Sequence, residues 1–390
     1  MRPIIFVAAV LMIASCSAPK KQADQDTVAG FRPHPQRVSK HEVSTLTIGS
    51  PAPAFTLPDV HGKMVSLADF SEATYLVIVF TCNHCPTAQA YEDRLIQFTS
   101  DYKDKGVQVA AIMPNSAAAL MPEECGYTDL TDNFEEMVIR SDYKKFNFPY
   151  LYDGDDEAVS IQYGPVATPH AFVFDRDRKL QYVGRMDGIE KPGKANAEDL
   201  RQAMDELIAG KPVTNAVTKS FGCSVKWGWK DEYNAHVLKE WMDKPVALEK
   251  LTDAGIREVI ANKSDKLRLI NVWATWCAPC VAEYPSIVEL QRWYGARSFE
   301  FISLSADNPD KEKKALEFLQ KKHSPVKNYL YDGEDKYKLI EAVDREWNGA
   351  LPYTLLVEPG GKIVYRNQGT VDLLELKRAI VEHPLIGRFY

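Results

Sequence analysis

The chain has 390 residues, more than two domains of about 150 residues each would need, so its length predicts two domains with connecting segments. Hydrophobic residues at 45% and charged residues at 26% exclude wholesale disorder, collagen and coiled coil. A net charge of −7 offers no attraction to phosphate backbones, and no strong basic patch stands out, so nucleic acid is not an expected partner. Seven cysteines are too few for a disulfide scaffold of this length, so their spacing matters more than their number.

The N-terminal segment has the features of a targeting signal. Residues 1–15 contain one Arg, a short apolar run and then small residues, a pattern typical of a signal peptide and too short to span a bilayer comfortably. The sequence Ile-Ala-Ser-Cys at 13–16 resembles the bacterial lipobox, in which the cysteine, here Cys16, is lipidated and becomes the mature N-terminus. An ordinary cleaved signal with an incidental cysteine is the alternative.

Residues 16–44 contain almost no clustered apolar side chains, so we expect a flexible tether. The protein would then hang from a lipid at Cys16 in the bacterial cell envelope, with its soluble domains in the periplasm, where disulfides persist. In the sorting logic of lipoproteins, Ser17 favours the outer membrane over the inner one.

Beyond residue 44 the sequence writes one module twice. Tyr-Leu-Tyr-Asp-Gly at 150–154 recurs at 329–333. Upstream of each copy an apolar run ends in Cys-x-x-Cys, and downstream a proline opens another strand. The cysteine pairs are Cys82/Cys85 and Cys277/Cys280, and the prolines are Pro169 and Pro352.

The elements of both copies follow one order. The pattern predicts strands at 75–80, 107–113, 171–174 and 181–185 with helices at 92–102 and 197–209 in the first copy. It predicts strands at 269–273, 299–304, 353–357 and 362–366 with helices at 286–294 and 373–382 in the second. This order indicates an α/β fold in which each copy has a mixed central sheet flanked by helices.

The module boundaries predict domains at 45–210 and 245–390. The first copy has an extra loop at 113–130. The linker at 211–244 carries Trp227, Trp229, Tyr233 and Trp241, which is too aromatic for a free tether, so we expect it to pack on a domain with 233–241 helical.

Each half resembles a thioredoxin-fold domain. The second, with Trp-Cys-Ala-Pro-Cys at 276–280 and Leu351-Pro352, resembles the TlpA/ResA-type extracytoplasmic thiol–disulfide oxidoreductases. The first, with Cys-Asn-His-Cys-Pro at 82–86, Thr-Pro-His at 168–170 and Gly-Cys-Ser-Val-Lys-Trp at 222–227, resembles the peroxiredoxin-like group of the redoxin superfamily. The resemblance implies tandem thioredoxin-like folds and redox chemistry at both cysteine pairs.

Disulfide exchange needs an attacking thiolate and a second thiol that resolves the mixed disulfide. A Cys-x-x-Cys places both on one helical turn, with the first at the helix N-terminus, where backbone N–H groups favour an anion. We therefore expect Cys82 and Cys277 to attack and Cys85 and Cys280 to resolve. A zinc site or an inert disulfide is the alternative for each pair. No metal or organic cofactor is expected.

The resemblance assigns further residues to the sites. Thr168-Pro169 and Leu351-Pro352 match the family's cis-proline, which lies against the cysteines and presents backbone to a substrate strand. His84 would stabilise the Cys82 thiolate and make the first couple the more oxidising one, unless it is a solvated loop residue.

Glu283 matches an acidic residue of the ResA branch that tunes thiol pKa values. The alternative for Glu283 is a solvated helix residue.

Besides Cys16, two cysteines remain outside the pairs, Cys125 in the long loop and Cys223 in the linker. Three alternatives stay open: a structural disulfide between them, two free thiols, or exchange with Cys82/Cys85.

The leading functional hypothesis is an envelope-anchored thiol–disulfide oxidoreductase, a reductase or relay that acts on protein thiols and disulfides and is supplied by a membrane electron donor. A thiol peroxidase is the second, although neither Cys82 nor Cys85 has the Pro-x-x-x-Thr-x-x-Cys spacing of peroxiredoxins. The third is a non-enzymatic binding scaffold with static cysteine pairs.

Overall fold

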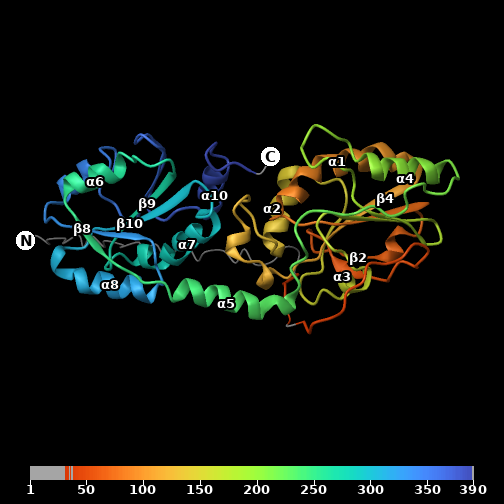
Figure 1. Cartoon of the computed structure of the whole chain (residues 1–390), viewed down its shortest axis with the longest axis horizontal. Helices are drawn as coiled ribbons and strands as arrows, with labels where there is room; N and C mark the ends of the chain where they lie inside the picture. Colours follow the sequence, from red (N-terminus) through yellow and green to blue (C-terminus); the bar gives the residue numbers. More distant parts are fainter. Residues whose placement is uncertain (1–30, 35, 37, 389–390) are drawn as a thin grey trace, which may run out of the picture.

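The computed structural model describes residues 31–34, 36 and 38–388, and these form two lobes side by side along the long axis of the molecule (Figure 1). Each lobe corresponds to one copy of the repeated module. We call them the first half, residues 45–210, and the second half, residues 245–388. The predicted signal at 1–15, the lipidation site Cys16 and the start of the predicted tether lie outside the described residues. Among the described residues, no helix is both long and apolar enough to cross a membrane.

The first half is built on a five-stranded sheet of order β5-β4-β3-β6-β7. Strands β3, β4 and β5 run parallel, β6 is antiparallel to β3, and β7 is antiparallel to β6. A separate hairpin, β1 with β2, precedes this sheet. The strands are β1 (Thr56–Pro58), β2 (Met64–Ser66), β3 (Tyr75–Phe80), β4 (Val107–Met113), β5 (Tyr150–Tyr152), β6 (His170–Phe174) and β7 (Leu180–Gly184). The helices are α1 (Pro86–Tyr102), α2 (Phe134–Lys144), α3 (Ala158–Tyr163) and α4 (Glu198–Ile208).

The second half repeats this plan with one more strand at the edge, in the order β13-β12-β9-β10-β11-β8. Strands β8 to β11 pair in parallel, whereas β12 is antiparallel to β9 and β13 is antiparallel to β12. The strands are β8 (Glu249–Leu251), β9 (Leu267–Trp273), β10 (Phe299–Ser305), β11 (Lys327–Tyr331), β12 (Tyr353–Val357) and β13 (Ile363–Gln368). The helices are α6 (Asp253–Ile260), α7 (Ala278–Tyr294), α8 (Glu312–Lys321), α9 (Lys336–Val343) and α10 (Leu373–Val381).

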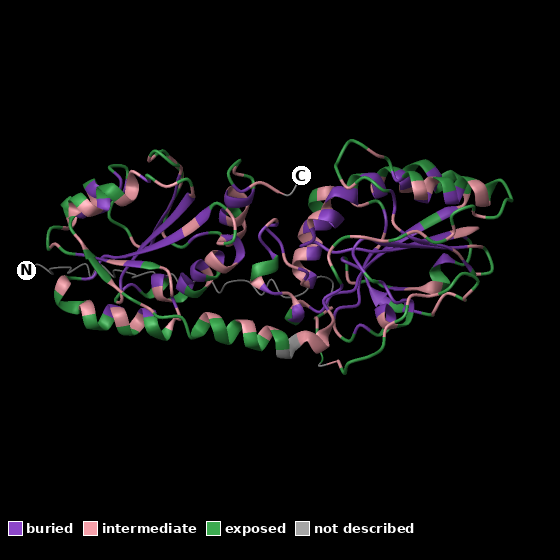
Figure 2. Cartoon of the chain, in the orientation of Figure 1, coloured by how far each residue is buried: buried purple, intermediate pink, exposed green. Residues whose placement is uncertain are grey.

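Both sheets are buried on two faces. The first sheet separates two hydrophobic clusters, and the second sheet separates two more. Figure 2 shows the buried strands at the centre of each lobe with exposed helix faces outside them. The predicted fold class, a mixed central sheet flanked by helices in each half, is confirmed.

The linker between the halves is ordered, as its aromatic content predicts. Val183 of β7 exchanges backbone hydrogen bonds with Ala216 and Thr218, which adds this part of the linker to the edge of the first sheet. Helix α5 (Asp231–Met242) then runs along one side of the molecule from the first half to the second (Figure 1). Its Trp241 donates from Nε1 to the carbonyl of His323 in the second half, at 3.1 Å.

The extra loop of the first copy forms much of the contact between the halves. Tyr294 of α7 donates its hydroxyl to the carbonyl of Thr128 at 2.8 Å, and Arg292 pairs with Glu123 at 2.7 Å. The buried carboxylate of Asp129 lies between Arg378 at 3.0 Å and Arg388 at 2.7 Å.

The free tether is not seen in the part of 16–44 that the structure describes. The ring of Phe31 packs edge-on against Phe134 with centroids 4.7 Å apart, and it also contacts Tyr152. Further on, His41 lies against Trp229. The described part of this segment is therefore attached to the first half, because a few aromatic side chains suffice to dock a chain that has no core of its own.

Candidate active sites

Strand pairing aligns the two cysteine pairs residue by residue. Val79 of β3 faces Ala171, two residues after Pro169, and Asn271 of β9 faces Thr354, two residues after Pro352. Val79 and Asn271 are therefore equivalent. Six residues further along the chain lie Cys85 in the first half and Cys277 in the second.

The helix caps give the same alignment. Cys85 is the N-cap of α1 and accepts a hydrogen bond from the Ala88 N–H at 3.4 Å. Cys277 is the N-cap of α7 and lies 3.3 Å from the Cys280 N–H. Cys82 precedes its helix by several residues and occupies no cap.

The prediction that Cys82 sits at the helix N-terminus is therefore wrong, whereas the prediction for Cys277 is confirmed. The prolines explain the difference, since a proline is tolerated in the first helical turn, where its missing N–H has no partner to lose. Pro86 follows Cys85 directly, so α1 starts there, whereas Pro279 stands second after Cys277.

The sulfurs of the first site lie against the predicted Thr168-Pro169 pair. Cys82 Sγ is 3.0 Å from the Thr168 hydroxyl, and Cys85 Sγ is 3.3 Å from the Thr168 carbonyl oxygen. Both cysteines are thiols here, and both are buried, with exposed fractions of 2% for Cys82 and 0% for Cys85. The Thr168-Pro169 and Leu351-Pro352 bonds are both cis, as the resemblance implied.

His84 is a buried residue paired with Asp132, not a solvated one. Its Nδ1 lies 2.5 Å from Asp132 Oδ2, and the other carboxylate oxygen accepts the backbone N–H groups of Asn83 and His84 at 2.9 and 3.0 Å. Burial by itself lowers the pKa of His84, but the charge and hydrogen bond of Asp132 outweigh it and raise the pKa overall. The first site therefore holds a buried imidazole–carboxylate pair directly beside Cys85.

This environment shifts the pKa values of the two thiols in opposite directions. Burial, the hydrogen bond to Cys85 and the charge of Asp132 raise the pKa of Cys82 well above its ordinary value. Burial also opposes ionisation of Cys85, but hydrogen bonds from the thiols of Cys223 and Cys82, together with the charge of His84, hold its pKa well below the ordinary value. His84 thus acts on Cys85, not on Cys82 as expected.

One cluster in the first site has the composition of a metal site. Ligand atoms of Cys82, His84 and Asp132 all lie within 4.8 Å of one another. Zinc in proteins usually takes four ligands. Here the carboxylate already accepts hydrogen bonds from two backbone N–H groups, from Asn115 and from His84, so its lone pairs are engaged within the protein.

The second site holds a disulfide between Cys277 and Cys280. Trp276, directly before it, is 67% exposed, whereas Trp273 is fully buried and donates to Ser303 Oγ at 2.7 Å. Cys277 and Cys280 are themselves buried, so the exposed indole of Trp276 marks the protein surface directly beside the disulfide.

Glu283 lies on α7 and is buried. Its carboxylate accepts hydrogen bonds from Asn271 at 3.3 Å and from the Val371 N–H at 3.1 Å. Burial raises its pKa against the effect of these two hydrogen bonds. The solvated-helix alternative for Glu283 is therefore wrong, and its tuning of the cysteines stays a prediction.

The structural disulfide between Cys125 and Cys223 is absent, because the two residues lie in different surroundings. Cys125 is buried in a hydrophobic cluster of the second half, with its thiol directed at the Met121 carbonyl. Cys223 lies at the first site, where its backbone N–H is 3.3 Å from Cys85 Sγ. Its neighbourhood corresponds to the third alternative, exchange with the first pair.

Sequence reasoning missed Asp132 and Asn115, which complete the first site. Asp132 lies just beyond the extra loop, and Asn115 lies inside it and donates to Asp132 Oδ2 at 2.7 Å. The sequence contains one indirect signal for Asp132. A histidine between two cysteines needs a hydrogen-bond partner when it is buried.

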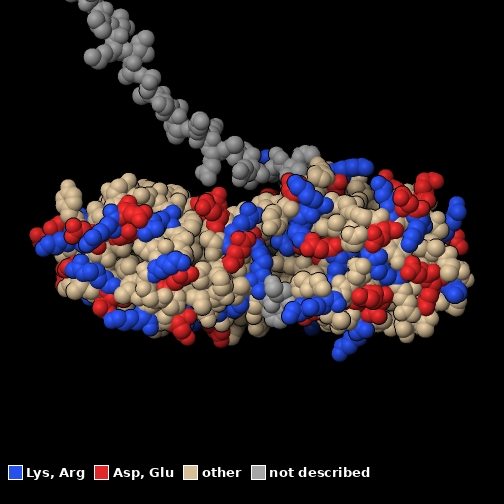
Figure 3. Space-filling model, turned by 90° about the horizontal axis from the view of Figure 1, so that it is seen from above, with Lys and Arg blue, Asp and Glu red and all other residues tan. Residues whose placement is uncertain are grey.

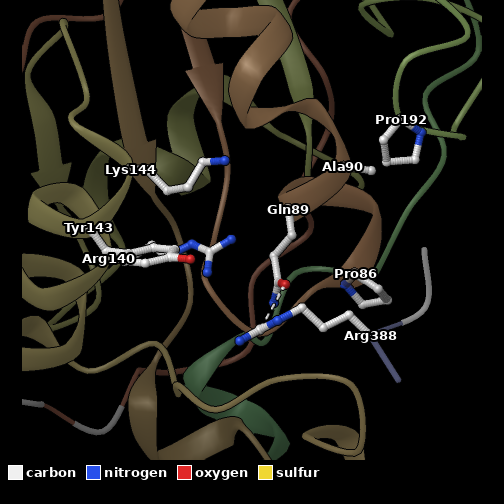
Figure 4. A pocket seen from close by; sticks show the side chains of 8 residues that line it. All are labelled: Pro86, Gln89, Ala90, Arg140, Tyr143, Lys144, Pro192 and Arg388. Carbon is white, nitrogen blue, oxygen red and sulfur yellow. Dashed lines mark hydrogen bonds between the residues drawn. The ribbon is translucent and has the colours of Figure 1, made fainter. Parts of the chain in front are cut away.

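A pocket of about 200 Å³ lies at the first turn of α1, next to Cys85 (Figure 4). Its lining joins both halves, since Arg388 of the second half reaches Gln89 of α1 at 3.4 Å. The basic side chains in its wall are already paired: Arg140 with Glu92, Lys144 with Asp93, and Arg388 with Asp129. The lining consists of Pro86, Gln89, Ala90, Arg140, Tyr143, Lys144, Pro192 and Arg388.

Charges of both signs are interspersed on the face of the molecule seen in Figure 3. On that face, Lys and Arg side chains lie close to Asp and Glu side chains in both lobes, with uncharged residues between them.

The two sites lie at different distances from the contact between the halves. Cys277 caps one end of α7, and Arg292 and Tyr294 at the opposite end contact the first half. Seventeen residues at 1.5 Å each make this helix about 25 Å long. Direct exchange between the two cysteine pairs therefore requires the halves to move relative to each other.

Comparison with known proteins agrees with this duplicated architecture. The model of the family described as Redoxin matches residues 47–200 and again 249–380. The thiol:disulfide interchange protein HelX of Rhodobacter capsulatus is 32% identical over 130 residues, which cover 32% of this chain and 63% of HelX. The thiol-disulfide oxidoreductase ResA of Bacillus cereus is 29% identical over 153 residues, covering 39% of this chain and 76% of ResA.

Among solved structures, a hypothetical protein from Sinorhizobium meliloti 1021 is 34% identical and superposes with a TM-score of 0.42, covering 48% of this chain and 98% of that one. The chain spans less than two thirds of HelX, the first of these curated relatives. The Redoxin match to both halves and the similarity to HelX and ResA confirm the resemblance stated from the sequence, and the two sheets of the structure confirm the tandem thioredoxin-like fold.

Proposed function

The chain belongs to the Redoxin family, and from that premise we propose that it is a thiol–disulfide oxidoreductase acting on protein disulfides through two Cys-x-x-Cys sites. One observation carries the proposal. In each half a cysteine caps the helix that follows the central strand, and a cis-proline precedes the antiparallel strand that pairs with that central strand. Backbone N–H groups at a helix N-terminus stabilise a thiolate, which is the attacking species in disulfide exchange.

The second site performs the exchange in two steps. The Cys277 thiolate attacks one sulfur of a substrate disulfide, so that a mixed disulfide forms and the other substrate sulfur leaves as a thiolate. Cys280 then loses its proton and attacks Cys277 Sγ, which releases the second substrate thiol and leaves the Cys277–Cys280 disulfide. Two electrons pass to the substrate, and a dithiol donor restores the reduced pair.

The first site has its thiolate at Cys85 and its second thiol at Cys82. We propose domains at 45–210 and 245–390, each carrying one site. We further propose a lipid anchor at Cys16, placement in the bacterial envelope on the periplasmic side, at the outer membrane, and a membrane dithiol as electron donor. The sequence features at residues 1–17 support this placement.

Insulin reduction tests the proposal. The whole chain, supplied with dithiothreitol, is expected to accelerate precipitation of the insulin B chain well above the rate with dithiothreitol alone. A rate equal to that background contradicts the proposal and favours a binding scaffold. Consumption of hydrogen peroxide with the same donor is measured in parallel, and turnover there with none on insulin favours the peroxidase alternative.

A further inference from the structure

A short segment of the linker covers the first site. We call residues 221–226 the strap. Cys223 in the strap pairs with Thr168 as an antiparallel bridge, with the Thr168 N–H donating to the Cys223 carbonyl at 2.9 Å. The Cys223 N–H points at Cys85 Sγ from 3.3 Å. The strap therefore brings a third sulfur to the pair.

The strap packs closely against the first half at both of its ends. Gly222 has a φ of +134°, and a Cβ there would lie 2.1 Å from the Thr168 carbonyl oxygen, so only glycine allows this approach. At the other end, the Lys226 N–H donates to Asn115 Oδ1 at 2.9 Å, and its carbonyl accepts from Ser116 at 3.0 Å. Asn115 also contacts Asp132, so one hydrogen-bond network holds the strap and His84.

Exposure differs among the three sulfurs. Cys82 and Cys85 are buried, whereas Cys223 is half-buried. A thiol or disulfide in solution therefore meets Cys223 before it can reach Cys85. At the second site, no isolated bridge of this kind reaches Leu351 among the described residues.

We propose that Cys223 is the third redox-active thiol of the first site, forming a disulfide with Cys85 in place of Cys82 and exchanging with thiols in solution. The inference rests on the proposed function in one respect, namely that Cys82 and Cys85 cycle between dithiol and disulfide.

The steps balance as follows. Starting from the Cys82–Cys85 disulfide, Cys223 loses its proton and attacks Cys85 Sγ; the Cys85–Cys223 bond forms, and Cys82 leaves and is protonated. A thiolate of an external dithiol then attacks Cys223 Sγ, and Cys85 leaves as the thiolate. The second thiol of the donor then attacks the donor sulfur that is bound to Cys223, which closes the donor disulfide and releases Cys223 as a thiol. The donor becomes a disulfide, and the site gains two electrons.

Disulfide mapping in a Cys82→Ser chain tests this assignment. The whole chain is oxidised with diamide, quenched in acid, alkylated and mapped by mass spectrometry. The expected product is a Cys85–Cys223 disulfide, and it is also expected in a Cys82→Ser, Cys125→Ser chain, since Cys125 lies elsewhere. Cys85 and Cys223 both recovered as free thiols in the oxidised chain would overturn the proposal.

A rate measurement keeps the test independent of that variant. Dithiothreitol is expected to reduce the Cys82–Cys85 disulfide at least about tenfold more slowly in the Cys223→Ser chain than in the parent. In the Cys125→Ser chain the rate of this reduction is expected to equal that of the parent. An unchanged rate in Cys223→Ser, with normal cycling in the parent, contradicts the role of Cys223 alone. A parent in which Cys82 and Cys85 never form a disulfide contradicts the proposed function of the first site instead.

Discussion

Replacing Cys277 with serine is expected to reduce insulin reduction by the whole chain on the order of 100-fold. Serine keeps the shape of the N-cap, but its hydroxyl does not ionise near neutral pH, so the attacking anion is lost. The first site compensates only slowly, because Cys223 of the strap lies directly against Cys85 and pairs with Thr168. The second site, with Trp276 exposed beside it, is therefore the main route to a protein disulfide.

Two further variants serve as comparisons for Cys277→Ser. Cys280→Ser keeps the attacking sulfur and removes the resolving one, so a mixed disulfide between Cys277 and insulin is expected to accumulate. Cys125→Ser changes a buried cysteine outside both sites and is expected to leave the rate unchanged. Parental activity in Cys277→Ser, with loss in Cys85→Ser, would assign the work to the first site instead.

Replacing Asp132 with asparagine is expected to destabilise the first half by about 3–5 kcal/mol, the range seen when one partner of a buried ion pair is removed. Asp132 is fully buried and accepts hydrogen bonds from Asn83, His84 and Asn115. An asparagine amide would turn a donor toward His84 or Asn115, and a buried donor would stay unpaired. Urea unfolding measures the change, with Asp142→Asn on the exposed side of α2 as the matched control.

The pH dependence of this effect has a defined sign. The pKa of His84 is raised in the folded chain, so its share of the stability is present below the ordinary value for histidine and is lost as pH rises through the folded pKa. The pKa of Asp132 is lowered, so its share is present above the ordinary value for aspartate and is lost as pH falls through the folded pKa.

The difference between parent and variant is therefore expected to be largest at mildly acidic pH. In the variant, NMR titration should show a lower pKa for His84, because burial remains and the carboxylate is gone. A His84 pKa that Asp132→Asn leaves unchanged would show that the pair does not control the site.

The arrangement of the halves bears on the relay hypothesis. Residues 113–130, an unexplained insertion in the sequence, form the contact with α7, and Cys277 lies at the far end of that helix. A reductase with two separately supplied sites fits this arrangement better than a direct relay within one chain.

The repeated motifs were enough to predict most of the fold. The strands at 107–113 and 353–357 have the predicted bounds, since a largely apolar run bounded by turn residues leaves little choice of ends. Helix α7 begins at Ala278, well before the predicted residue 286. An interior proline normally ends a helix, so the sequence favours a start after Pro285, but the structure accommodates Pro285 inside the helix.

The site could be predicted only where its residues are neighbours in the sequence. Both cysteine pairs and the Thr168-Pro169 and Leu351-Pro352 bonds were named in advance. The contacts of Asp132 with His84 and of Cys223 with Cys85 join residues 48 and 138 positions apart, and no local pattern encodes them. The role of Cys85 was misassigned because the helix start was counted from the first cysteine, not from Pro86.

The proposed function depends on cysteine pairs that both switch reversibly between dithiol and disulfide. The most direct measurement equilibrates the whole chain in glutathione buffers of graded potential, traps it with acid and quantifies each pair by mass spectrometry. A two-electron transition is expected at both pairs, with Cys82/Cys85 the more oxidising couple because the buried His84 favours the Cys85 thiolate. A pair that stays in one state across the whole range would contradict the proposed function.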